Sequence, residues 1–179
     1  QAKEFVAHIS MANQVYASGD YSQAHKLYID ALAVDTENNL MLNIIYFNMA
    51  QASYQLKNYI NCLLELNVTL SLDRNHVKAL ILRARCHINM KYLDEATVDL
   101  NRAKTCTGIS NETFAEINNM LDQIALMRKA KEDRNEVLNV STSSSMQEIT
   151  KAYWKLMKKH HPDRHSNATE EEKEYHAAK

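Results

Sequence analysis

The 179-residue chain contains very little glycine and proline. Its glycines are Gly19 and Gly108, and its one proline is Pro162. The tight turns of β-sandwiches and β-barrels depend on these residue types, so the composition argues against both architectures. We therefore predict an all-α fold of long helices with short connections, and the length fits one helical array plus a small module.

An excess of basic residues is also missing. The chain has 21 lysines and arginines against 22 aspartates and glutamates, which gives a formal net charge of -1 at pH 7. A protein that binds nucleic acid usually carries a broad positive field. We therefore expect no nucleic-acid partner, and any electrostatic recognition must be local.

Cysteines are few, and no CxxC or CxxH spacing links Cys62, Cys86 and Cys106. Each lies among apolar residues of a helical pattern, which favours buried free thiols in a reducing compartment over a disulfide. No apolar run approaches the ~20 residues that cross a bilayer, and no signal peptide is visible. We expect a cytoplasmic location and no membrane partner. Because the chain opens with Gln1 and closes in a polar stretch, we also expect it to be a fragment.

Three stretches of the chain repeat one arrangement of small and large residues. Ala12 and Ala50 are 38 positions apart, and Ala50 and Ala84 are 34 apart. Small residues at such positions let two antiparallel helices approach closely, while large residues fill the gaps between successive pairs. The pattern predicts three helix pairs, over residues 5–38, 43–76 and 77–110.

The first repeat resembles the tetratricopeptide-repeat (TPR) family in its sequence, which is YASGDYSQAHKLYIDAL from residue 16 to 32. The 34-residue spacing is the period of that family. The resemblance implies a superhelix of helix pairs that binds other proteins. The later repeats are more degenerate, because Lys57 and Lys91 occupy the position of the turn glycine and neither repeat has the closing proline. An unrelated helical bundle is the alternative.

One long helix is predicted after Gly108, from near Asn111 to about Leu138. Its first half should pack on the last repeat, so residues 111–132 are predicted to be a capping and spacer helix. The serine-rich run at 141–145 then ends the helical pattern. Ser145, with Glu148 three residues later, is a capping-box signature for the next helix.

The segment that follows, SMQEITKAYWKLMKKHHPDRH, resembles helix II and the signature loop of the J-domain (DnaJ) family. The tripeptide His161-Pro162-Asp163 follows an Ala-Tyr-x-Lys-Leu helix at the distance usual in that family. Residues 133–179 are therefore predicted to be the N-terminal part of a J domain, with helix I, helix II, the tripeptide loop and the start of helix III. Without the remainder of helix III, such a domain could not close its core.

This resemblance implies a co-chaperone that recruits a DnaK-type, seventy-kilodalton heat-shock chaperone and stimulates its ATPase. A basic helix would steer toward an acidic surface of the ATPase domain, while Asp163 would engage a basic residue there. An ordinary solvated helix face is the other interpretation of the lysines. The chaperone-binding residues that the resemblance assigns are His161, Pro162, Asp163, Tyr153, Lys151, Lys155, Lys158 and Lys159.

The resemblance is weaker at helix I, where residues 133–140 are DRNEVLNV and lack the two tyrosines and the glycine of the family. A TPR scaffold with a vestigial J segment is therefore a second hypothesis for function. A lumenal relative that binds misfolded polypeptide directly with its repeats is a third.

The TPR resemblance also implies a peptide site on the inner helices. Asn13, Asn48 and Lys78 stand where the family places a carboxylate clamp for the acidic C-terminal tails of the seventy- and ninety-kilodalton heat-shock chaperones. Ile9 and Leu82 replace a lysine and an arginine that are usual there. Two lost cations should weaken binding, since each charge-assisted contact contributes on the order of 1.5–3 kcal/mol.

Two neighbouring arginines could restore a cation to this site. Arg83 and Arg85 follow Leu82 on the same predicted helix. Either would compensate only if its side chain pointed toward the peptide rather than in the direction that the repeat pattern gives it.

An enzyme would have to use the histidines near the C-terminus, where His160, His161 and His165 could be imagined as zinc ligands. Only the last two share a four-residue spacing, and Pro162 breaks the helix that would align them. No nucleophile elbow or phosphate-cradling glycine loop is present either. We predict no catalysis by the chain itself, and neither a metal nor a cofactor.

Overall fold

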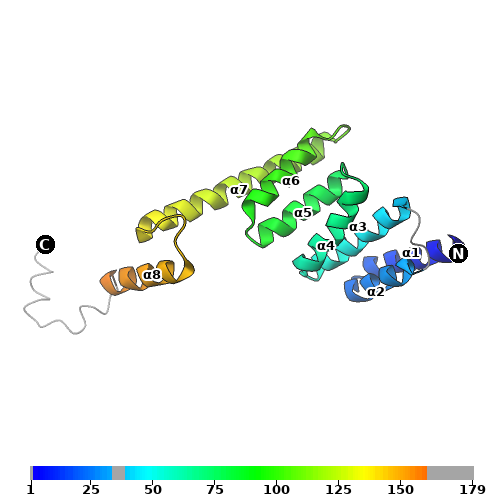
Figure 1. The fold of residues 1–179 in the computed structure, drawn as a ribbon, viewed down its shortest axis with the longest axis horizontal. Helices are drawn as coiled ribbons and strands as arrows, with labels where there is room; N and C mark the ends of the chain where they lie inside the picture. Colours follow the sequence, from blue (N-terminus) through cyan, green and yellow to red (C-terminus); the bar gives the residue numbers. More distant parts are fainter. Residues whose placement is uncertain (1, 34–38, 161–179) are drawn as a thin grey trace, which may run out of the picture. The chain divides into compact units, whose positions relative to one another are not determined.

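The computed structural model of the protein describes residues 2–33 and 39–160. Within these two ranges the chain forms eight helices and no strand, so the all-α fold class is confirmed (Figure 1). It divides into two compact units, Gln1–Ile124 and Ala125–Lys179, and each is described by itself. The helices are α1 Ala2–Ala17, α2 Tyr21–Leu32, α3 Asn39–Gln55, α4 Tyr59–Leu72, α5 Val77–Asn89, α6 Leu93–Thr105, α7 Asn111–Leu138 and α8 Met146–His160.

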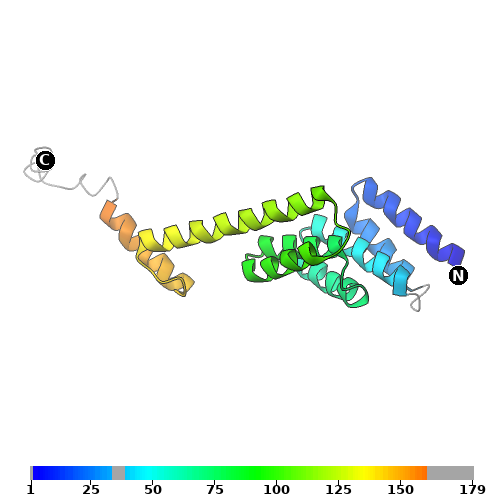
Figure 2. The same ribbon diagram turned by 90° about the horizontal axis from the view of Figure 1, so that it is seen from above.

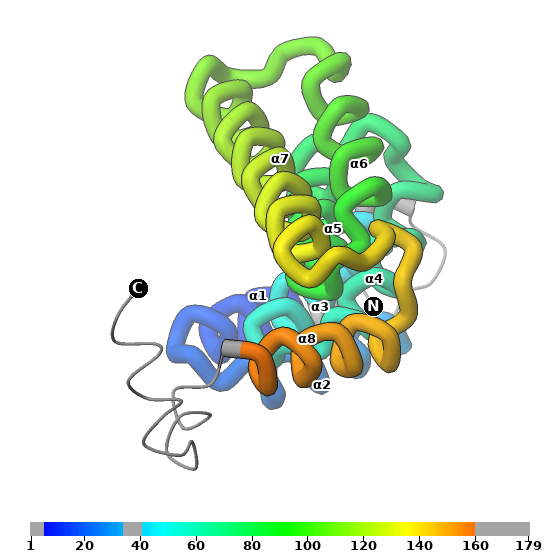
Figure 3. Tube along the Cα trace, turned by 90° about the vertical axis from the view of Figure 1, so that its left-hand side faces the viewer, coloured from blue at the N-terminus to red at the C-terminus, as the bar shows by residue number. Residues whose placement is uncertain are grey.

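The first unit contains the three predicted helix pairs. Helices α1 and α2, α3 and α4, and α5 and α6 run antiparallel, and each pair also packs on the next through α2 against α3 and α4 against α5 (Figures 1 and 2). Figure 3 follows the chain from α5 through α6 into the first half of α7. This arrangement leaves the first helix of each pair facing one side of the unit and the second helix facing the other.

The turns inside the three pairs share one backbone conformation. Gly19, Lys57 and Lys91 all have positive φ, at 90°, 58° and 66°. Glycine takes this left-handed conformation without steric cost, whereas a residue with Cβ is uncommon there. The two lysines therefore keep the turn geometry of the first repeat despite losing its glycine.

Side-chain caps begin the second helix in two of the pairs. The Asp20 carboxylate accepts a hydrogen bond from the Gln23 backbone N–H at 3.0 Å, and the Asn58 amide oxygen accepts one from the Asn61 N–H at 3.3 Å. Both satisfy a backbone donor that the first helical turn would otherwise leave unpaired. The turn and the cap together fix where α2 and α4 start.

The helix pairs are held together by small residues that are completely buried. The alanines at the repeat positions have no exposed surface, which lets the paired backbones approach closely, as the repeat pattern predicts. The first half of α7 closes the end of this core, where Ile117, Met120 and Ile124 are buried against residues of α4 to α6. The fully buried repeat alanines are Ala12, Ala24, Ala31, Ala50, Ala84, Ala96 and Ala103.

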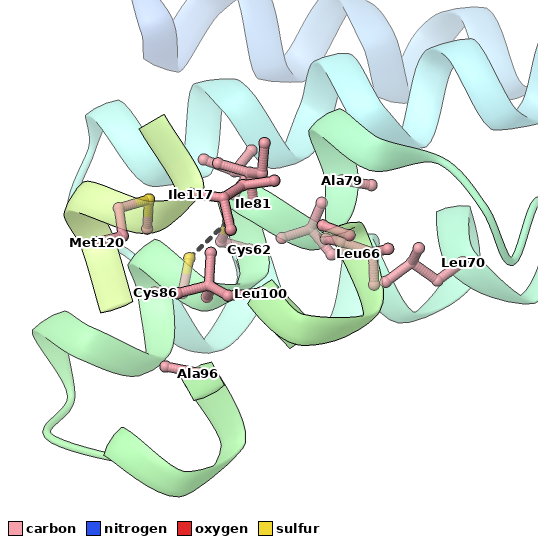
Figure 4. Packing of buried hydrophobic residues seen from close by; sticks show 14 of the residues in the cluster. Cys62, Leu66, Leu70, Ala79, Ile81, Cys86, Ala96, Leu100, Ile117 and Met120 are labelled. Atoms are coloured by element: carbon pink, nitrogen blue, oxygen red, sulfur yellow. Dashed lines mark hydrogen bonds between the residues drawn. The ribbon is translucent and has the colours of Figure 1, made fainter. Parts of the chain in front are cut away.

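The cysteines are free thiols, as predicted, but only two of them are buried. Cys62 and Cys86 lie in the core with their sulfur atoms 3.1 Å apart, whereas Cys106 is half-buried (Figure 4). The hydrogen bond from Cys86, together with burial, raises the pKa of the Cys62 thiol far above its usual range. The Cys62 thiol therefore stays protonated, and both buried cysteines act as small packing residues.

In the second unit, the rest of α7 is followed by a short turn and by α8. The capping box is present: the Ser145 hydroxyl accepts from the Glu148 backbone N–H at 3.3 Å, and the Glu148 carboxylate accepts from the Ser145 N–H at 2.7 Å. The Ser145 N–H and the Ser145 hydroxyl both donate to the Glu148 carboxylate, at 2.7 and 3.0 Å, and these two hydrogen bonds lower the pKa of Glu148. Of the helices that the structure describes, none has the length and apolarity of a membrane span.

Candidate peptide groove and chaperone-binding helix

An open groove of about 420 Å³ lies on the first helices of the repeats and on the start of α7. Aromatic and apolar side chains share its surface with two cations and one carboxylate. A concave surface with a few convergent polar groups is the usual form of a binding site. The lining residues are Tyr16, Phe47, Gln51, Tyr54, Gln55, Lys78, Ile81, Leu82, Arg85, Thr113 and Glu116.

Two of the predicted clamp residues come together. The Asn48 amide nitrogen donates to the Asn13 side-chain oxygen at 3.2 Å, and the Tyr28 hydroxyl donates to the same oxygen at 2.6 Å. Burial raises the pKa of Tyr28 to about 12, so this hydroxyl remains a donor at neutral pH. Asn13 is thereby held in one orientation between α2 and α3, although neither asparagine lines the groove.

Lys78, the third predicted clamp residue, does line the groove. It stands in the first turn of α5 and is exposed. Leu82 lies one turn further along the same wall, so the position that the family gives to an arginine is apolar here.

The two arginines after Leu82 point in different directions. The Arg83 guanidinium donates to both oxygens of the buried Asp99 carboxylate, at 2.8 and 2.6 Å, and to Asn67 at 2.8 Å. It is therefore committed to the contact between α5, α6 and α4. Arg85 instead lines the groove, where its guanidinium is 2.5 Å from the Glu116 carboxylate of α7. Of the two arginines, only Arg85 could supply the missing cation.

A second open hollow, of about 550 Å³, adjoins the groove further along α5 and α7. It shares Tyr54, Arg85 and Glu116 with the first. Sequence reasoning missed Phe47, Tyr54 and Glu116. The signal that could have found Phe47 and Tyr54 is helical spacing, since they stand two turns apart on one face of α3, as Lys78 and Arg85 do on α5. No such signal marks Glu116.

The predicted chaperone-binding helix is α8. Lys151, Lys155, Lys158 and Lys159 are all exposed, and Tyr153 is also exposed beside Trp154, with the two rings 5.7 Å apart. Ile149, Ala152 and Leu156 are half-buried and form an apolar stripe along the helix. The tripeptide His161, Pro162 and Asp163 lies outside the described residues.

The described residues contain no group of three or more histidine, cysteine, aspartate or glutamate side chains that could hold a metal ion. His161 and His165, two of the three imagined zinc ligands, lie outside the described residues. The prediction that the chain uses no metal and no cofactor therefore stays a prediction.

Comparison with known proteins finds matches to both parts of the chain. Residues 133–179 match the sequence model of the DnaJ domain family. The mouse (Mus musculus) protein DnaJ homolog subfamily C member 7 is 30% identical over 182 residues, covering 97% of this chain and 36% of the relative. The human (Homo sapiens) protein of the same name matches to the same extent. The chain thus spans about a third of the length of these curated relatives.

The repeats resemble solved TPR structures. The first TPR of Spaghetti (RPAP3) bound to the HSP90 peptide SRMEEVD has a TM-score of 0.60 at 21% identity and covers 70% of this chain and 96% of that one. The Hsp90 co-chaperone Cns1 of Saccharomyces cerevisiae has a TM-score of 0.68 at 22% identity, covering 75% and 43%. At this identity the likeness shows the fold. The protein therefore joins a helical array with the tetratricopeptide-repeat fold to a segment that matches the DnaJ domain family.

Proposed function

We propose that the protein is a co-chaperone that recruits a seventy-kilodalton heat-shock chaperone with its DnaJ segment and stimulates the ATPase of that partner. The observation that carries this proposal is the DnaJ match over residues 133–179, which includes the tripeptide His161-Pro162-Asp163. The repeats of the same chain would hold a chaperone tail or a client polypeptide. The protein would act in the cytosol and catalyse no reaction itself.

The exposed lysines of α8 support the recruitment step. They place several positive charges along one helix of a chain whose net charge is only -1. Such a local positive surface accelerates the encounter with an acidic partner and orients it. Asp163 would then engage a basic residue of the ATPase domain and favour the conformation that hydrolyses ATP.

The groove of the first unit supports tail binding by the repeats. Lys78 and Arg85 are two cations that can pair with carboxylates of a peptide. Apolar side chains of the peptide can contact Phe47, Tyr54 and Leu82. The RPAP3 structure carries an HSP90 peptide on a similar repeat fold, and Cns1 is named as an Hsp90 co-chaperone. We therefore propose acidic C-terminal peptides of the seventy- and ninety-kilodalton chaperones as ligands.

Exchange of Asp163 for asparagine tests the recruitment step. In the natural protein, Asp163→Asn should reduce stimulation of ATP turnover to the basal rate of the seventy-kilodalton chaperone, because the amide has no charge for the basic residue of the partner. Steady-state ATP turnover measures this, with Asp133→Asn on α7 as the control. Equal stimulation by the wild type and Asp163→Asn, or none by either, would favour the TPR scaffold with a vestigial J segment.

Removal of the Lys78 ammonium tests tail binding. Lys78→Ala should weaken binding of the peptide SRMEEVD about tenfold, because a charge-assisted hydrogen bond contributes roughly 1.5 kcal/mol. Fluorescence anisotropy with a labelled peptide measures the affinity. Lys57→Ala, at an exposed turn that does not line the groove, is the matched control. If both variants bind as the wild type does, the groove is not the peptide site.

A further inference from the structure

One ion pair is shared by the two hollows of the first unit. Arg85 of α5 and Glu116 of α7 line both hollows and face each other at 2.5 Å. The order along α5 is Lys78 in the first hollow, Arg85 in both, and Asn89 in the second. From Lys78 to Asn89 the helix rises roughly 16 Å, which an extended peptide covers with about five residues.

The two hollows differ in charge. The first has Lys78 and Arg85 against Glu116, whereas the second has Arg85 against Glu112 and Glu116. The formal charges therefore sum to +1 in the first hollow and -1 in the second. A ligand that matches both would be acidic at one end and basic at the other.

The ion pair between the hollows is easily displaced. The Arg85 and Glu116 side chains are 46% and 40% exposed. Exposed pairs of this kind contribute little to stability, and a ligand carboxylate can replace the one that the protein supplies. Arg83, also on α5, is by contrast committed to the fold through its ion pair with the buried Asp99 of α6.

We propose that Arg85 and Glu116 exchange partners when a peptide binds, so that the two hollows become one continuous site for an extended peptide of mixed charge. A carboxylate of the peptide pairs with Arg85 and releases Glu116. Glu116 and Glu112 then bind a basic residue of the same peptide. The site thus selects acidic peptides that also carry a basic residue a few positions away. This inference rests on the proposed binding of tail peptides by the repeats.

Two peptides distinguish this selection from simple recognition of acidic residues. The peptide SRMEEVD carries an arginine two positions before its first glutamate, and the peptide SAMEEVD lacks that basic residue. The wild type should bind the arginine peptide about two- to five-fold more tightly, the range that one exposed ion pair gives. The double variant Glu112→Gln/Glu116→Gln should bind the two peptides equally.

The single variant Glu116→Gln tests the exchange itself. It should bind SAMEEVD about two- to five-fold more tightly than the wild type, because Arg85 no longer has a carboxylate to give up. Glu95→Gln on α6, an exposed carboxylate that lines neither hollow, should leave both affinities unchanged. Isothermal titration calorimetry on the full chain measures all of these affinities.

The outcomes separate the two proposals. If the wild type binds both peptides but the arginine preference survives in the double variant, the partner exchange is wrong and tail binding stands. The exchange is equally overturned if Glu116→Gln binds SAMEEVD no better than the wild type. If no variant binds either peptide, tail binding by the repeats fails and this inference fails with it.

Discussion

Replacement of Arg83 by methionine should lower the free energy of unfolding of the repeats by about 3 kcal/mol. Arg83 neutralises Asp99, whose side chain is only 5% exposed, through two hydrogen bonds of 2.8 and 2.6 Å. Methionine keeps the apolar stem and removes the charge, which leaves a carboxylate in the core without its main counter-charge. Removing one partner of a buried ion pair typically costs about 3–5 kcal/mol, and the partial exposure of Arg83 places this pair at the lower end.

Urea denaturation followed by far-UV circular dichroism measures this loss, and α5 provides its own control. Arg85→Met removes an arginine two positions further along, from an ion pair that is exposed on both sides, and should change the free energy of unfolding by less than about 1 kcal/mol. The double variant Arg83→Met/Asp99→Leu should recover most of the loss, since it leaves no uncompensated charge. Equal effects of Arg83→Met and Arg85→Met would contradict the distinction between a structural and a displaceable pair.

Much of the fold could be predicted because the repeat is encoded locally. Ala12, Ala50 and Ala84 mark equivalent helices by their spacing alone, and the structure buries all three completely. The turn residues were harder to interpret. Lys57 and Lys91 differ from the glycine of the first repeat, yet their positive φ shows that position in the repeat, rather than residue type, sets the turn.

The candidate groove could be predicted only in part, because its lining depends on side-chain direction and on contacts between residues distant in sequence. Asn13 and Asn48 were identified from their repeat positions, and they do meet. Arg83 and Arg85 are two positions apart and point about 160° apart on α5, so spacing places only Arg85 on the face of Lys78. The partner of each arginine lies on another helix and cannot be predicted from the sequence of α5. Glu116 was missed because nothing in the sequence of α7 indicates that it faces α5.

Asp99 and Cys86 show that contacts inside the core are also hard to predict from the sequence. An aspartate within an apolar helix pattern suggests an exposed position, and here it is buried because Arg83 reaches it from the adjacent helix. Cys86 was expected to be buried, but its contact with Cys62 joins two different repeats and has no signature in either one. The sequence pattern of one helix predicts which of its faces is apolar. Which residues of two helices contact each other is known only from the packed structure.

The packing between repeats gives the second large effect. Leu100→Ala should lower the free energy of unfolding by about 3 kcal/mol, because Leu100 is completely buried beside residues of α4, α5 and α7, and the truncation leaves a cavity that rigid neighbouring helices cannot fill. Val98→Ala, two residues away on α6, is the control, since Val98 is 67% exposed and its truncation should change stability by less than about 0.5 kcal/mol. Chemical denaturation of both variants measures the difference.

The same pair of variants separates stability from binding. Leu100 and Val98 line neither hollow, so both variants should bind SRMEEVD with wild-type affinity at temperatures where they are folded. A large loss of affinity in folded Leu100→Ala would mean that the α6 core sets the position of the groove walls on α5 and α7. A small loss of stability would mean instead that the third helix pair can close around the cavity. We expect Leu100→Ala to bind SRMEEVD with unchanged affinity despite its lower stability, because the cations of the groove lie on the surface and Leu100 lies in the core.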